Sequence, residues 1–260
     1  MADTDTEVVP DDEFSGEADE ERVSESGIIR MTREEFLREG WDYQPGEHVT
    51  IIGPTGSGKT WLGYQLLEVT ATPELPAVVL VMKPRDNTVT KWSKTVGYRI
   101  VRSWPPPASP WRPRKPPGFV VWPRPTYDPD VDDYRQHIIF RRVILDSYKK
   151  GRRILFGDEV YSLAQELALT KELVTVWSKG RSMDCGLWCA SQKPTHIPLW
   201  AYSQAEHLFL AFDPDKRARD RFSEIGGVDP KLVERTVLTL GKHEWLYFRR
   251  SDGAMCIVEK

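Results

Sequence analysis

Short runs of consecutive apolar residues recur along the chain, and each is long enough for one buried strand. They lie within residues 48–52, 77–83, 152–160, 186–192 and 205–212. Runs without polar alternation are typical of strands buried on both faces, as in a parallel sheet. Segments with apolar residues at helical spacing lie between them, at 61–69 and 130–151, and a helix-like segment and a strand (244–249) follow. The alternation predicts an α/β fold with a mostly parallel sheet and helices on both faces.

The first helix is marked by its end signals. Thr32 is followed three residues later by Glu35, which is the pattern of a capping box, and Gly40 is a typical residue just past a helix end. Trp41 and Tyr43 come next, before the first apolar run. We expect these two rings either to stack on a bound adenine or to pack against the edge of the domain.

Residues 104–129 break the alternation. They hold many of the chain's 20 prolines, together with Trp104, Trp111 and Trp122 and several arginines. Proline cannot donate a hydrogen bond in a helix or a central strand, so we expect a surface insertion with polyproline-like stretches. One short strand, residues 119–122, is expected inside it. Two interpretations stay open: an insertion whose tryptophans pack on the body, or an arm whose arginines and aromatic rings contact a partner or DNA.

Charge is distributed unevenly along the 260 residues. Residues 1–27 carry eleven carboxylates and one arginine; removing this net charge of −10 from the total of −3 leaves +7 for residues 28–260. We expect an acidic, disordered tail at 1–27 and one domain at 28–260. The tail is either a solubilising leader, a partner-binding arm or a cover for a basic nucleic-acid surface.

Composition narrows the class of protein. Three cysteines form no disulfide framework in a chain of this length, which indicates a reducing compartment. No apolar run approaches the roughly 20 residues that span a bilayer, and no secretion signal is recognisable. We therefore expect a soluble protein with no membrane span, located in the cytoplasm, which for a viral protein means the host cytoplasm or the virion.

The strongest chemical signal is the glycine-rich stretch GPTGSGKT. It fits the phosphate-binding loop pattern G-x-x-x-x-G-K-[ST] and stands between an apolar strand and a helical segment, as that motif requires. Its residues are Gly53, Pro54, Thr55, Gly56, Ser57, Gly58, Lys59 and Thr60. The glycines allow the backbone N–H groups to approach a phosphate. Lys59 is expected to bridge the β- and γ-phosphates of ATP, and the Thr60 hydroxyl to ligate Mg²⁺.

A second motif, the apolar run 154–156 followed by Gly157, Asp158 and Glu159, has the Walker B pattern. Asp158 is expected to hold Mg²⁺ opposite Thr60, and Glu159 to orient and deprotonate the attacking water. A water-activating glutamate favours hydrolysis over transfer to another acceptor. Gln192, at the end of the apolar run 186–192, can touch both the γ-phosphate and that water, and we expect it to report the nucleotide state.

Together these motifs resemble the FtsK/HerA superfamily of DNA-pumping ATPases. The discriminating part is KGRSMDCGLWCASQKPTHIP, with Arg181, a glycine and apolar strand, Ser191-Gln192 and Pro194. The resemblance covers roughly residues 46–250. It implies a P-loop NTPase fold of the RecA-like (ASCE) class and a homo-oligomeric ring, a hexamer or a pentamer, with ATP at subunit interfaces and duplex DNA in the channel. It also implies an arginine finger for the neighbouring subunit; Arg181 matches by position, with Arg217, Arg219 and Arg221 as alternatives.

Within that superfamily, a near-minimal ATPase with an acidic leader is most similar to viral, in particular phage, genome-packaging ATPases. The resemblance therefore implies an ATP-driven translocase of double-stranded DNA that works with a capsid or portal protein. Candidate contacts to DNA phosphates are basic residues around the 130–151 helix: Arg141, Arg142, Lys149, Lys150, Arg152 and Arg153. The alternatives are a DNA-transfer or filamentous-phage-type assembly ATPase, a phosphotransferase, and a nucleotide-dependent scaffold.

Overall fold

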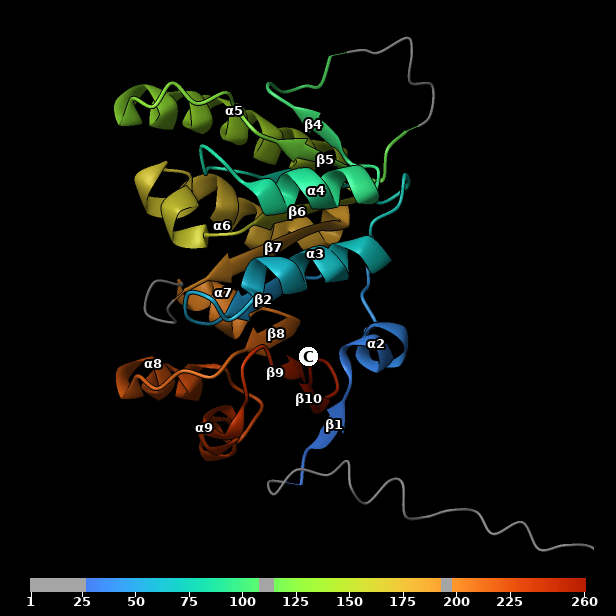
Figure 1. Cartoon of the computed structure of the whole chain (residues 1–260), viewed down its shortest axis with the longest axis vertical. Coiled ribbons are helices and arrows are strands. Elements are labelled where there is room, and N and C mark those ends of the chain that lie inside the picture. The colour runs from blue at the N-terminus through green and yellow to red at the C-terminus, as the bar shows by residue number, and fades with distance from the viewer. Residues whose placement is uncertain (1–26, 108–114, 193–197) are drawn as a thin grey trace, which may run out of the picture.

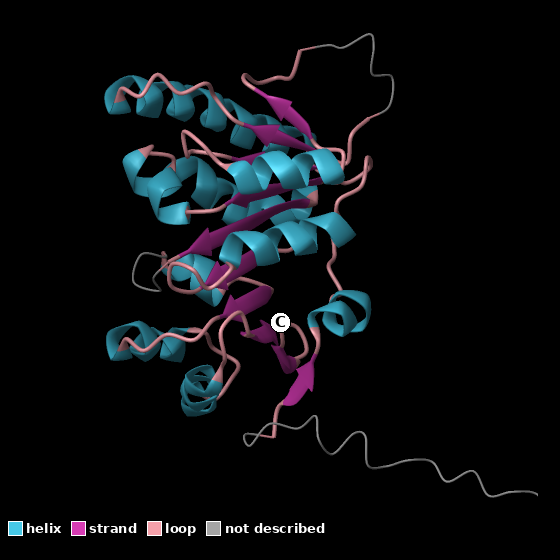
Figure 2. Ribbon diagram, in the orientation of Figure 1, coloured by secondary structure: helices cyan, strands magenta, loops and turns pink. Residues whose placement is uncertain are grey.

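The computed structural model describes residues 27–107, 115–192 and 198–260 (Figure 1). The expected acidic tail, except Gly27, lies outside these residues, as do Trp111 and Pro194. Strands of the described residues form one sheet (Figure 2). It has ten strands in the order β1-β10-β9-β8-β2-β7-β6-β3-β5-β4. The strands are β1 (Ile29–Met31), β2 (Val49–Ile52), β3 (Ala77–Leu80), β4 (Arg99–Val101), β5 (Gly118–Val121), β6 (Arg153–Gly157), β7 (Cys185–Ser191), β8 (His207–Leu210), β9 (Trp245–Arg249) and β10 (Met255–Val258).

The seven strands from β8 to β4 pair in parallel, and only β9 among the described strands runs in the opposite direction to its neighbours. The central strands are buried along their whole length, which explains why they read as continuous apolar runs in the sequence. The prediction of a mostly parallel α/β sheet is therefore confirmed.

Helices cover both faces of the sheet (Figures 1 and 2). On one face, α3 (Lys59–Thr70) and α4 (Asn87–Thr95) pack with side chains such as Ile51 and Phe156, and Phe36, directly after α2 (Arg33–Glu35), joins them. On the other, α5 (Pro129–Lys150), α6 (Thr170–Lys179), α7 (Leu199–Ser203) and α9 (Pro230–Thr239) pack with Leu155 and Leu187, and α8 (Lys216–Asp220) precedes α9. None of the described helices combines the length and the apolar character that crossing a membrane requires.

Local signals in the sequence explain where several helices begin. The capping box at Thr32 is present: its hydroxyl accepts from the Glu35 N–H at 3.2 Å, and the Glu35 carboxylate accepts from the Thr32 N–H at 2.9 Å. Helix α2 continues directly into a π-helical turn, Phe36–Gly40. Asp128 caps α5, Pro129 occupies its first turn, and Gly151 follows it with a positive φ of 67°.

The expected surface insertion at 104–129 needs correction for part of its length. Strand β5 lies inside the sheet, paired with β3 on one side and β4 on the other. Trp104 and Trp122 are buried, and the Trp104 indole N–H donates to Asp146 at 3.0 Å. The prolines misled the expectation because they lie on either side of β5 and leave its own N–H groups free to pair. The described part of the segment packs its tryptophans on the body.

Candidate functional site

The glycine-rich loop connects β2 to α3 at the carboxyl edge of the sheet. Gly56 and Gly58 have φ values of 84° and 95°, a region that residues with a Cβ rarely adopt. A Cβ on Gly53 would lie 2.6 Å from that of Ala211, so the loop also needs glycine there for space. The Lys59 ammonium donates to the carbonyls of Gly53 at 2.7 Å and Pro54 at 3.0 Å. The sequence-predicted loop thus has the backbone shape of a phosphate cradle.

Asp158 follows β6 and lies directly opposite the start of α3. The Thr60 hydroxyl donates to its Oδ1 at 2.6 Å, and the Lys83 ammonium donates to its Oδ2 at 3.0 Å. Thr60 and Asp158, predicted as magnesium ligands, are therefore side by side although 98 residues separate them. A hydroxyl and a carboxylate are oxygen ligands of the kind that Mg²⁺ prefers, and both face the same cavity.

Glu159 has different neighbours from Asp158. Its Oε1 accepts from the buried Ser191 hydroxyl at 3.0 Å and, less closely, from the Tyr161 N–H at 3.4 Å. The Ser191 carbonyl also accepts from the Gly53 N–H at 3.2 Å, which joins the end of β7 to the glycine-rich loop. The two acids at the end of β6 therefore have different partners: Asp158 contacts the Thr60 hydroxyl, and Glu159 is oriented by Ser191 of β7.

Gln192 lies where the sequence predicted, one residue beyond β7. Its side-chain oxygen accepts from the Thr55 hydroxyl of the glycine-rich loop at 3.1 Å. A cavity of about 360 Å³ is lined by Gln192 together with the other predicted groups, Lys59, Thr60, Asp158 and Glu159. The structure thus brings together all the site residues that the sequence assigned to one subunit.

A second hollow of about 430 Å³ adjoins the first, because Thr55 and Gly56 line both. Its other walls include Phe212, Leu240 and the turn at 241–243. The His243 ring lies 3.0 Å from the Ser57 carbonyl and so holds this turn against the loop. Apolar side chains and a ring beside a phosphate cradle suit the base and sugar of a nucleotide.

Trp41 and Tyr43 line neither hollow. They pack against Trp188, so of the two roles expected for them the structure supports packing.

The two lysines of the main cavity differ in environment. Burial lowers the pKa of Lys59, and the nearby charge of Lys83 adds to that effect. The pKa of Lys83 is raised instead. Partial burial acts to lower it, but the attraction of Asp158 and the hydrogen bond to Asp158 outweigh burial. Both ammonium groups face a cavity that also holds Asp158 and Glu159.

Two residues of the site, Lys83 and Ser191, had no chemical role in the sequence analysis. Lys83 ends the apolar run 77–83, and Ser191 ends the run that precedes Gln192. Polar residues at the carboxyl ends of parallel strands gather at one edge of the sheet, and ligands of open α/β sheets bind there. Gln192 was chosen because it is a polar residue at the end of an apolar run, and the same criterion would have identified Lys83 and Ser191.

Arg181 is not part of this cavity. It lies in the turn Gly180–Met183, which leads into the amino end of β7, whereas the glycine-rich loop follows the carboxyl end of the parallel strand β2. Its side chain is exposed, at the opposite edge of the sheet from the cavity. Its role toward a neighbouring subunit stays a prediction.

The alternative finger residues lie near α8. Arg219 donates to the Asp213 carbonyl at 3.0 Å and to Glu234 at 3.3 Å, and Arg221 pairs with Glu224 at 2.8 Å. Arg217 is exposed. Two of the three alternatives are thus already engaged within the subunit.

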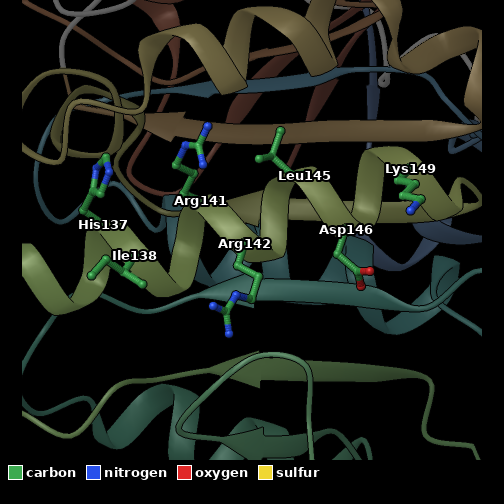
Figure 3. A pocket seen from close by; sticks show the side chains of 7 residues that line it. All are labelled: His137, Ile138, Arg141, Arg142, Leu145, Asp146 and Lys149. Carbon is green, nitrogen blue, oxygen red and sulfur yellow. The ribbon is translucent and has the colours of Figure 1, made fainter.

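The basic residues proposed to contact DNA lie along and just after α5, where a hollow of about 520 Å³ opens (Figure 3). Arg141 pairs with Glu172 at 2.8 Å, and Lys150 pairs with Asp146 at 3.0 Å. Arg142 donates to the Trp104 carbonyl at 3.2 Å. Arg152 pairs with Asp184 at 3.6 Å, and the Arg153 guanidinium lies over the Trp104 ring. Lys149 lines the hollow. Most of these cations therefore have partners within the chain.

Comparison with known proteins gives a likeness of fold. No protein-family model and no curated protein matches the chain. Among solved structures, the DNA-packaging ATPase B204 from Sulfolobus turreted icosahedral virus aligns with a TM-score of 0.59 at 17% identity, over 84% of this chain and 98% of that one. B204 from Sulfolobus turreted icosahedral virus 2, in complex with AMPPCP, gives a TM-score of 0.58 at 17% identity, over 84% and 99%.

VirB4 of Thermoanaerobacter pseudethanolicus also matches, with a TM-score of 0.55 at 10% identity, over 82% of this chain and 88% of that one. At such low identities these alignments establish the fold and not the activity. The resemblance to FtsK/HerA-type and viral packaging ATPases, expected from the sequence, is confirmed at that level, and so is the P-loop NTPase fold.

Proposed function

We propose that this protein hydrolyses ATP to translocate double-stranded DNA, as the motor ATPase that packages a viral genome. The observation that carries the hydrolytic part is the pair of acids after β6: Asp158 meets Thr60, and Glu159 is held separately by Ser191. A phosphate site with one acid for the metal and a second for water is equipped for hydrolysis.

In the proposed reaction, the glycine-rich loop and Lys59 hold the phosphates of ATP, with Thr60 and Asp158 as the ligands for Mg²⁺. That ion would neutralise charge on the phosphates. Glu159 accepts a proton from the attacking water as the new bond to the γ-phosphorus forms and the bond to the bridging oxygen of ADP breaks. Gln192 is in reach of the same cavity and would transmit the loss of the γ-phosphate to β7.

The DNA-handling part of the proposal rests on two observations. One is the likeness of fold to the DNA-packaging ATPase B204, and the other is the positive charge of residues 28–260. A ring of five or six copies would place Arg181 of one copy against the nucleotide of the next, and a capsid or portal protein would hold the ring. A positively charged surface binds DNA with an affinity that falls steeply with salt.

The test is ATP hydrolysis by the purified full-length chain with and without linear duplex DNA. We expect duplex DNA to stimulate turnover. Glu159→Gln keeps the oxygen that accepts from Ser191, so the variant should fold and bind ATP, while the loss of the base lowers turnover by about 10²–10⁴-fold. Hydrolysis at the same rate with and without DNA, also in the presence of a portal or capsid protein, would overturn the translocase proposal. An unimpaired Glu159→Gln variant would remove Glu159 from the base role.

A further inference from the structure

Lys83 lies three residues beyond β3, on the wall of the cavity that also contains Lys59, Asp158 and Glu159. Its ammonium lies 3.0 Å from Asp158 Oδ2, and its side chain is 60% exposed. The fold therefore gives the proposed nucleotide site a second lysine, from the segment after β3, which lies three positions from β2 in the sheet with β7 and β6 between them.

The backbone of Lys83 is fixed although its side chain is open to solvent. The Trp122 indole N–H donates to the Lys83 carbonyl at 2.8 Å, and Gln136 donates to the Met82 carbonyl at 3.2 Å. The Val81 N–H, two residues before Lys83, donates to the Val121 carbonyl at 3.1 Å. A long, flexible side chain on a fixed backbone can exchange one anionic partner for another nearby without moving the strand.

A metal ion bound at Asp158 would compete with the Lys83 ammonium for this carboxylate. Its Oδ1 accepts from Thr60, and its Oδ2 faces the Lys83 ammonium. A divalent cation that approaches this carboxylate repels the ammonium, because like charges a few ångströms apart in a half-buried site repel strongly. The phosphates that accompany the cation bring the replacement anion into the same cavity.

We propose that Lys83 is a second phosphate-binding cation of this site, one that pairs with Asp158 and passes to the terminal phosphate of a bound nucleoside triphosphate. This inference rests on the proposed nucleotide site and adds a contact made by the same subunit. Lys59 reaches the phosphates from the glycine-rich loop, and Lys83 reaches them from the other side of the cavity. An ammonium that contacts the last phosphate distinguishes a triphosphate from a diphosphate.

The experiment compares the affinities of the full-length protein for Mg²⁺ with AMPPCP and for Mg²⁺ with ADP, measured by calorimetry. Lys83→Met keeps the length of the side chain and removes the charge. Because one charge-assisted contact is lost, we expect the AMPPCP affinity to fall by about tenfold, while the ADP affinity stays within about twofold. Lys83→Arg should restore most of the preference. Lys94→Met is the matched control, since Lys94 is exposed on the neighbouring helix α4 and lines no hollow described above.

Unequal loss for the two nucleotides supports the proposal. An equal loss of affinity for both nucleotides, together with a lower melting temperature, would mean that Lys83 only supports the fold. Unchanged affinities would mean that Lys83 does not contact the nucleotide. Either result overturns the proposal. The outcome is separable from the proposed function because binding requires no turnover and no DNA. If the unmodified protein binds neither nucleotide, the site assignment itself fails.

Discussion

The hydrogen bond from Ser191 to Glu159 gives the sharpest test of how this site is assembled. Ser191 is fully buried at the end of β7, and its hydroxyl donates to Glu159 Oε1 at 3.0 Å. A second hydrogen bond to this carboxylate among the described residues, from the Tyr161 N–H, is longer at 3.4 Å. Replacement of Ser191 by alanine removes one oxygen atom and leaves the backbone bond from the Gly53 N–H to residue 191 in place.

The expected size of the effect follows from the kind of bond that is lost. A hydrogen bond to a charged acceptor contributes about 1.5–3 kcal/mol. The half-buried Glu159 can regain part of this from water, so we take the lower end, which corresponds to about a tenfold fall in kcat. The affinity for ATP should change little, because Ser191 does not line the nucleotide cavity. Steady-state hydrolysis and nucleotide binding measured on the same preparations give the two quantities.

A double-mutant cycle decides whether Ser191 acts through Glu159. In a Glu159→Gln background, the additional Ser191→Ala change should have almost no effect on the residual rate. A further tenfold fall in that background would refute the reasoning, and so would an unchanged kcat in the single variant. Ser93→Ala is the control, because Ser93 is equally buried but lies on α4, where its hydroxyl donates to the Thr90 carbonyl of the same helix.

Two further predictions concern stability and assembly. Burial lowers the pKa of His48 to about 4, and its ring accepts from the Leu187 N–H and contacts the Trp177 carbonyl. In the unfolded chain this pKa is near 6.5, so below that pH the unfolded state takes up a proton that the folded state does not. The free energy of unfolding should therefore fall as the pH drops below about 6.5, by about 2 kcal/mol at pH 5. Urea unfolding at pH 7.5 and 5 should show a smaller difference for His48→Asn, and an equal difference would contradict this origin. Arg181→Ala mixed with unmodified protein should lower hydrolysis more than dilution does, whereas a loss proportional to the mixing ratio would argue against a finger that acts in the neighbouring subunit.

The sequence predicted best those parts whose physics is local. The central strands are buried on both faces, so their apolar runs mark them directly, as for 77–83 and 186–192. The glycine-rich loop is equally local, since Gly56 and Gly58 need positive φ and Lys59 and Thr60 follow them at fixed spacing. The positions of Thr60 and Asp158 beside each other follow from parallel strands whose carboxyl ends share one edge.

The remaining features depend on contacts between distant segments, which no local pattern encodes. Strand β5 was recognised as a short strand, but its place between β3 and β4 depends on Trp104 and Trp122 packing into the body. Helix α4 was not predicted from the sequence because its nine residues contain three threonines, which have low helix propensity. In the structure, the packing of its Trp92 against Tyr64 stabilises the helix. The contact between Lys83 and Asp158 joins residues 75 positions apart.

The arrangement of strand ends also indicates which element can sense the nucleotide. The end of β7 meets three parts of the site: the Ser191 carbonyl meets the Gly53 N–H, the Ser191 hydroxyl meets Glu159, and Gln192 meets Thr55. A shift of the glycine-rich loop or of Glu159 when the γ-phosphate leaves must therefore strain or break a bond to β7. Within the part of the chain that the structure describes, Lys83 bonds to Asp158 and Trp122, neither of which belongs to β7. We therefore expect coupling between the proposed hydrolysis and movement to pass through Ser191 and Gln192 at the end of β7, whereas the role proposed for Lys83 concerns nucleotide binding alone.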